Sequence, residues 1–219
     1  MRAVICQDAD EAVADIADGA TVLVGGFGPA GMAETLIDAL IRQGATELTV
    51  VSNNAGNGTT GLAALLAEGR VRKMVCSYPR QADSWVFDDL FRTGKIQLEL
   101  VTQGNLAERM RAAGAGIGGF YCPVTVGTPL AEGKESRLID GRIHVLEHPL
   151  RGDVALIGAH QADGLGNVVY RKTARNFGPV MATAAATVIV EVAQVVPTGA
   201  LDPETIVTPC IYVDRVVTR

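Results

Sequence analysis

Three glycines near the amino terminus have a spacing that could serve a bound ligand. Gly26, Gly28 and Gly31 stand in the pattern G-x-G-x-x-G within TVLVGGFGPAGMAE, between an apolar run and a segment with helical periodicity. In dinucleotide-binding folds this pattern presents backbone N–H groups to a pyrophosphate, and an acidic residue about 20 positions further on binds the ribose. Here Pro29 has no N–H, and the next apolar run ends in SNNAGNG without an acid. The spacing alone therefore leaves a nicotinamide-dependent oxidoreductase as a remote alternative.

Carboxamide side chains at the ends of predicted strands favour an acyl group as the ligand. Asn53 and Asn54 follow the run 48–52, and Gln103 follows the run 96–101. The carboxyl ends of parallel strands share one edge of a sheet, so these turns could converge with the glycine loop on one crevice. Backbone N–H groups and neutral amides there could hold a thioester carbonyl while negative charge develops on its oxygen. Each of these residues taken alone is more typical of a turn than of a binding site, and only their joint placement favours the functional interpretation.

The sequence contains no recognisable nucleophile or metal site. The patterns G-x-S-x-G, H-E-x-x-H and the P-loop lysine are all absent. His144, His148 and His160 are spaced like strand residues, which is typical of structural or surface histidines, and Cys76 is interpreted as a core thiol. The chain is therefore predicted to carry half of a catalytic site.

The elements that must position these residues alternate between apolar runs and helical periods. This alternation predicts an α/β fold with an open, mainly parallel sheet and helices on both faces. The expected strands are 21–24, 48–52, 73–77 and 96–101, and the expected helices are 33–42, 61–68, 83–92 and 106–113.

The second half of the chain does not show this regular alternation of predicted strands and helices. Asp140–Gly141 between two strand-like segments predicts an antiparallel hairpin insertion, and a second hairpin is expected in ALIGAHQADGLGNVVY with its turn at residues 164–166. A helix running into a long strand is expected across 174–196, and a final strand across 206–217. No linker or repeat interrupts the chain, which predicts one domain over residues 1–219.

Composition limits the classes of partner. The formal net charge of −5, with scattered Lys and Arg, provides no basic face for nucleic acid. No apolar stretch is long enough to cross a membrane and acidic residues come early, which predicts a cytoplasmic protein without a signal peptide. The four cysteines form no C-x-x-C pair.

Several segments together resemble one known family. They are GGFGPAGMAE, VSNNAGNG, VCSYPRQADSWVFDDL, TQGNLAERMRAAGAGI, LAEGKESRLIDGR, YRKTARNFGPVMATAA and TPCIYVDRVV. In this order, and almost from end to end, they are similar to the A (alpha) subunit of the family I 3-oxoacid CoA-transferases, with a CoA-transferase/NagB-like fold. Two segments, NNAGNGTTGLAALL and PRQADSWVFDDLFRTGKIQLE, look closer to members that act on 3-oxoadipate than to those that act on acetoacetate.

The resemblance implies a ping-pong transfer of CoA from succinyl-CoA to a 3-oxoacid. It passes through an acyl anhydride and a glutamyl-CoA thioester whose glutamate belongs to a separate B (beta) subunit, in an αβ or α2β2 assembly. CoA esters are then substrates, and no cofactor is permanently bound. The residues that match the family's CoA-binding loop are Gly25, Gly26, Phe27, Gly28, Pro29, Ala30 and Gly31, and those that match acyl-pocket positions are Asn53, Asn54 and Gln103.

Several points stay open at this level. Ala33 stands where the family usually has a proline, which should soften the loop rather than abolish it. A dicarboxylate acceptor such as 3-oxoadipate, which would indicate the beta-ketoadipate pathway of aromatic degradation, needs an extra cation, for which Arg80 and Arg109 are candidates. The alternatives are acetoacetate as acceptor and a non-catalytic CoA-ester-binding protein.

Overall fold

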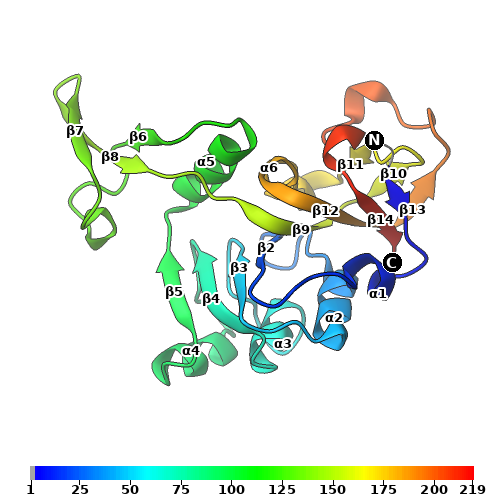
Figure 1. Ribbon diagram of the computed structural model, residues 1–219, viewed down its shortest axis with the longest axis horizontal. Helices are drawn as coiled ribbons and strands as arrows, with labels where there is room; N and C mark the ends of the chain where they lie inside the picture. The colour runs from blue at the N-terminus through cyan, green and yellow to red at the C-terminus, as the bar shows by residue number, and fades with distance from the viewer. Residues whose placement is uncertain (1–2) are drawn as a thin grey trace.

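Eight parallel strands form the main sheet of the protein, which the computed structural model describes over residues 3–219. Figure 1 shows these strands running through the middle of the molecule. Their order across the sheet is β1 (Val4–Ile5), β14 (Arg215–Thr218), β12 (Ala185–Val192), β9 (Gly152–Gly158), β2 (Thr21–Val24), β3 (Leu48–Val51), β4 (Val71–Cys76) and β5 (Gln97–Leu100). The chain order reverses at the β2–β9 pair, because β3, β4 and β5 follow on one side and β12 and β14 on the other.

Helices cover both faces of this sheet, as expected for the α/β class. Successive side chains of a strand point to opposite faces, so Val22 and Val24 pack in one apolar cluster while Leu23 packs in the other. The first cluster includes α1 (Ala9–Val13), α2 (Glu34–Gln43), α3 (Leu62–Ala67) and α4 (Trp85–Arg92), and the second includes α5 (Gln103–Gly114) and α6 (Gly178–Ala184). The two groups of helices lie below and above the sheet in Figure 1.

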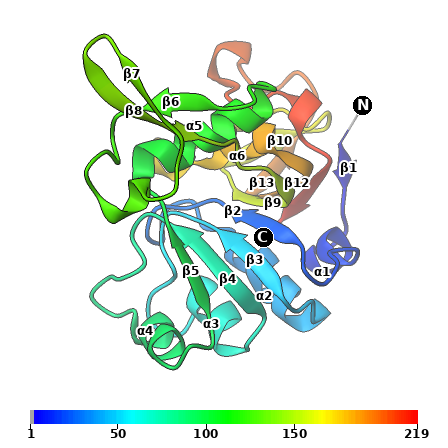
Figure 2. The same ribbon diagram turned by 60° about the vertical axis from the view of Figure 1, so that its left-hand side comes forward.

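An antiparallel insertion, which we call the arm, projects from the body beside α5 (Figures 1 and 2). It contains β6 (Phe120–Cys122), β7 (Ser136–Ile139) and β8 (Arg142–Glu147) in the order β6-β8-β7, with the short 3-10 turn η1 (Pro129–Ala131) between β6 and β7. Asp140 and Gly141 both have positive φ, +48° and +74°, as a two-residue type I′ hairpin turn requires. The hairpin predicted at this dipeptide is therefore confirmed.

A second small sheet has the order β11-β10-β13. Its strands are β10 (Gln161–Asp163), β11 (Val168–Val169) and β13 (Gln194–Val196), and β10 and β11 form the antiparallel pair that turns at residues 164–166. The predicted turn is confirmed, but the first strand of the hairpin, β10, is shorter than expected. The run ALIG belongs instead to β9, in the centre of the main sheet.

The strand predicted over residues 206–217 is wrong in its first three quarters. The structure has the 3-10 helix η4 (Cys210–Tyr212) there, and β14 begins only at Arg215. Pro209 explains the difference, because a residue without an N–H cannot continue a ladder inside a sheet. The predicted helix that runs into a long strand is present as α6 followed directly by β12. Two more 3-10 turns, η2 (Lys172–Arg175) and η3 (Pro203–Thr205), complete the elements.

Over the part of the chain that the structure describes, no helix has both the length and the apolar character needed to span a bilayer.

Candidate functional site

A cavity of about 540 Å³ lies where β2, β3 and β4 end and α5 begins. Asn53 and Gln103 face each other in its wall, and the Gln103 Nε2 donates a hydrogen bond to the Asn53 Oδ1 at 2.8 Å. Phe27 of the glycine loop is exposed beside them. The full lining is Phe27, Asn53, Ser77, Tyr78, Gln81, Ala82 and Gln103. We call this space the amide cavity, because carboxamides supply most of its polar groups.

Four of these lining residues were not candidates from the sequence: Ser77, Tyr78, Gln81 and Ala82. A signal for them was present, because they end or follow a predicted strand at the same sheet edge as Asn53. Gln103 also differs from its expected setting, since it is the first residue of α5 rather than part of a turn. The helix was expected to begin three residues later.

Asn54 does not share the amide cavity with Asn53. Its side chain lines an adjoining space of about 220 Å³, together with Gly28 and Gln81 among others. The Asn54 Oδ1 accepts the backbone N–H of Gly56 at 3.0 Å, which closes a turn, and its Nδ2 has no hydrogen-bond partner. Asn54 therefore combines the turn role with a free donor, and Gln81 lines both spaces.

Unpartnered polar atoms gather at this edge of the sheet. Ser52 Oγ and Ser77 Oγ, like Asn54 Nδ2, are buried without a hydrogen-bond partner, and all three follow closely on β3 or β4. A buried polar group left unsatisfied costs about 1–3 kcal/mol, so such a cluster indicates a site shaped by something other than stability. Cys76, the last residue of β4, is fully buried, and burial raises the pKa of its thiol to about 12. It is therefore protonated at neutral pH, which agrees with its interpretation as a core thiol.

The glycine loop forms a tight turn that uses most of its own amides. Phe27 and Ala30 exchange backbone hydrogen bonds of 3.0 and 3.3 Å, with Gly28 at φ +58° and Pro29 between them. The N–H groups of Gly25 and Gly26 also have partners within the protein, and Pro29 has no N–H to offer. Within residues 3–219, no hydrogen bond engages the N–H of Gly28 or that of Gly31. The loop thus has two backbone N–H groups without a partner in the described part of the chain, those of Gly28 and Gly31.

The amino terminus of α2 already holds a carboxylate from within the protein. The helix begins at Glu34 after Ala33, which makes no side-chain capping bond. The Leu36 N–H donates to the Glu191 Oε2 at 3.1 Å, and Glu191, on β12, forms an ion pair with Arg219 at 3.1 Å. Glu191 is almost fully buried, and this burial raises the pKa of its carboxyl group. The side chain of Glu191 therefore occupies the start of α2.

The two arginines considered for a distal carboxylate lie elsewhere. Arg80 pairs with Asp88 at 2.6 Å on the surface. Arg109 pairs with Glu99 at 2.9 Å and donates to the backbone oxygen of His148, in a separate cavity of about 490 Å³ under the arm. Neither side chain lines the amide cavity, whose lining in the described part of the chain is uncharged.

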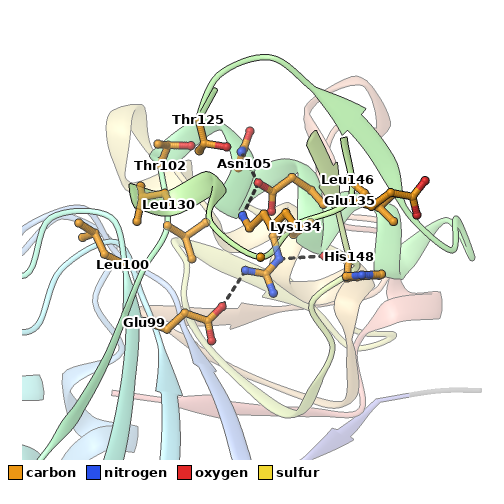
Figure 3. A pocket seen from close by; sticks show the side chains of 14 residues that line it. Glu99, Leu100, Thr102, Asn105, Thr125, Leu130, Lys134, Glu135, Leu146 and His148 are labelled. Atoms are coloured by element: carbon orange, nitrogen blue, oxygen red, sulfur yellow. Dashed lines mark hydrogen bonds and ion pairs between the residues drawn. The ribbon is translucent and has the colours of Figure 1, made fainter. Parts of the chain in front are cut away.

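The cavity under the arm is lined by a network of charged and polar side chains. The Lys134 Nζ and the Asn105 Nδ2 both donate to the Glu147 Oε1, at 2.6 and 3.1 Å. Figure 3 shows Lys134 and Asn105 side by side in the wall of this cavity. The bond from Asn105 joins the arm to α5, two residues beyond Gln103. This network therefore holds the arm against the helix that carries Gln103.

Potential metal ligands do not cluster in the described residues, which hold no group of three or more His, Cys, Asp or Glu side chains placed to bind an ion. The three histidines lie outside the amide cavity.

Comparison with known proteins identifies the family to which this chain belongs. A family model described as coenzyme A transferase matches residues 6–219, and the chain belongs to this family. It is 65% identical over 206 residues to the A subunit of the 3-oxoadipate CoA-transferase of Pseudomonas putida, covering 94% of this chain and 89% of the relative. It is 47% identical over 213 residues to the A subunit of a probable succinyl-CoA:3-ketoacid coenzyme A transferase of Bacillus subtilis (strain 168), covering 97% and 89%.

The solved structures agree with the fold. The acyl-CoA transferase YdiF of Escherichia coli O157:H7 superimposes with a TM-score of 0.87 at 26% identity, over 100% of this chain. The chain spans only 47% of the length of that protein. The family resemblance and the fold class predicted from the sequence are both confirmed.

Proposed function

We propose that this chain is the alpha subunit of a heteromeric CoA-transferase that moves CoA from succinyl-CoA to a 3-oxoacid, with 3-oxoadipate as the acceptor. The observation that carries the proposal is the Gln103–Asn53 pair in an uncharged cavity at the carboxyl edge of the sheet. The 65% identity to the corresponding chain of a 3-oxoadipate CoA-transferase supports the choice of acceptor.

Gln103 is the donor in the amide cavity that we assign to the substrate carbonyl, and Gly28, which lines the adjoining space, offers a backbone donor to the CoA ester. Gln103 uses one Nε2 hydrogen for Asn53, which fixes the orientation of the amide and leaves the second hydrogen for a ligand. The Gly28 N–H is unpaired on the loop beside Phe27. Preorganised donors of this kind stabilise the negative charge that develops on a thioester oxygen under attack. Asn54 shapes the neighbouring turn, and loop residues 25–31 contact the CoA ester.

The chemistry requires a carboxylate that this cavity lacks. A beta-subunit glutamate attacks the succinyl-CoA carbonyl and expels the CoA thiolate, leaving an acyl anhydride. The thiolate then attacks the glutamyl carbonyl, which releases succinate and forms an enzyme thioester. The acceptor carboxylate repeats these steps in reverse and leaves as its CoA ester. Uncharged amides suit these reaction steps because they orient the carbonyl without competing for protons.

Exposed aromatic residues mark the rim that the beta subunit would cover. Phe27 and Tyr78 line the amide cavity and are still 53% and 62% exposed, and Trp85 at the start of α4 is 56% exposed. Aromatic side chains are enriched in the centres of protein interfaces. We place the beta subunit on this face, where it would close the cavity and bring its glutamate to the carbonyl.

The acceptor is tested by initial rates with the complex of this chain and its beta subunit. We expect kcat/KM for 3-oxoadipate to exceed that for acetoacetate by about tenfold or more, because a missing contact of about 1.4 kcal/mol changes the rate tenfold. The reverse preference would make acetoacetate the acceptor, an alternative that the 47% identical relative supports. Binding of succinyl-CoA without transfer to either acid would indicate a non-catalytic CoA-ester-binding protein. The nicotinamide alternative is disfavoured further because most loop amides have partners within the protein.

A further inference from the structure

We propose that Asn176 is a positioning residue for the transfer site, holding the glycine loop in the shape that exposes Phe27 and the Gly28 N–H. The inference rests on the proposed function, and it concerns a residue that lies outside the amide cavity. Asn176 follows η2, in the segment that connects β11 to α6.

One carboxamide ties both ends of the loop's turn. The Asn176 Oδ1 accepts the N–H of Gly26 at 3.1 Å, just before the turn, and its Nδ2 donates to the backbone oxygen of Ala30 at 2.8 Å, at the end of the turn. The Asn176 Oδ1 also accepts the N–H of Phe177 at 2.7 Å. Asn176 is separated from Gly26 by 150 positions in the sequence and from Ala30 by 146, so its side chain acts as a clamp between two distant segments.

The packing around the loop leaves it little freedom to adopt another shape. A Cβ on Gly31 would lie 2.3 Å from the Ala174 backbone oxygen and 2.8 Å from the Asn176 Nδ2. On the other side, a Cβ on Gly158 at the end of β9 would lie 2.7 Å from the Gly31 oxygen. The last glycine of the G-x-G-x-x-G pattern is thus required for close contact with the Asn176 segment, in addition to its φ of +76°.

The clamp needs both a donor and an acceptor, which explains a carboxamide at this position. Aspartate keeps an oxygen for the Gly26 N–H but loses the donor to Ala30, and its charge would face the Ala30 backbone oxygen. Alanine loses both contacts. The two changes therefore separate the role of the donor from the role of the whole side chain.

The test uses the complex with the beta subunit, in the wild-type form and in three variants: Asn176→Ala, Asn176→Asp and the control Asn167→Ala. Asn167 is a matched control because its carboxamide also joins two segments, bonding Asp163 and the Cys210 N–H, without touching the glycine loop. We expect Asn176→Ala to lose on the order of 10- to 100-fold in kcat, because small misplacements of catalytic groups have effects of this size. The kcat of Asn167→Ala should stay within about twofold of the wild-type value, even if its melting temperature falls as much as that of Asn176→Ala.

The pH profile of Asn176→Asp provides a readout that a merely structural role would not move. Protonation of the carboxyl group restores a donor to Ala30, so the activity of this variant relative to wild type should rise as the pH falls towards about 5. A flat ratio, or an Asn176→Ala variant as active as the control, would overturn the inference.

Amide hydrogen exchange separates this inference from the proposed function. The N–H groups of Phe27 and Ala30 should exchange at least several-fold faster in Asn176→Ala than in the control, whether or not the complex transfers CoA. If the wild-type complex transfers no CoA, the proposed function fails and the exchange result alone decides the role of Asn176. Unchanged exchange at both amides would refute the clamp.

Discussion

At the scale of single residues, the candidate site depends on carboxamides whose orientations are fixed by other polar groups. Asn53 accepts from Gln103, and Asn176 holds Gly26 and Ala30. The first pair could be anticipated, because both residues follow strands at one sheet edge. The second could not, because a hydrogen bond between such distant segments leaves no local periodicity or spacing in the sequence.

Gln103→Ala should slow turnover more than it weakens substrate binding. A donor aimed at developing charge acts mainly in the transition state, so we expect kcat to fall on the order of 100-fold while KM for succinyl-CoA changes by about twofold or less. Initial rates of the complex measure both constants. Gln97→Ala, at the opposite end of β5, is the control and should match the wild type. A Gln103→Ala enzyme with normal kcat would mean that Gln103 has a purely structural role and does not act in the transition state.

At the scale of elements, local patterns predicted most helices and strands of the main sheet, and failures have physical causes. The elements β1 and α1 have only two and five residues, too few to show a period. Pro209 shortened the last strand, and the run predicted as one hairpin was divided between two sheets. Local sequence could not indicate that β12 would supply Glu191 to the start of α2, because this contact depends on how the sheet assembles.

Because of Glu191, the free energy of unfolding of the protein should depend on pH. Burial raises its pKa in the folded state above the unfolded value of about 4.3, so folding favours the protonated form. Its contribution to stability is therefore full at low pH and is lost as the pH rises through the folded pKa. Glu191→Gln removes this titration while retaining an oxygen for the Leu36 N–H.

Urea unfolding of both proteins at about pH 4, 5.5 and 7 measures this effect. The free energy of unfolding of the wild type, minus that of Glu191→Gln, should decrease as the pH rises over this range. A difference that grows with pH would mean that the ion pair with Arg219 outweighs burial.

At the scale of the whole molecule, the topology explains why the site lies where it does. The glycine loop leaves β2 at the point where the strand order reverses, between β2 and β9. Open α/β sheets bind ligands at the carboxyl ends of the strands beside such a reversal, because the flanking connections run to opposite faces and leave a crevice. The amide cavity lies at this edge, and its aromatic rim is exposed.

The central claim is that this chain supplies oriented amides and another chain supplies the attacking carboxylate. Its most direct test is CoA transfer from succinyl-CoA to 3-oxoadipate by this chain alone, by the isolated beta subunit, and by the two mixed. We predict no measurable transfer by either chain alone and rapid transfer by the mixture. Transfer by this chain alone at a rate comparable to that of the mixture would contradict the account.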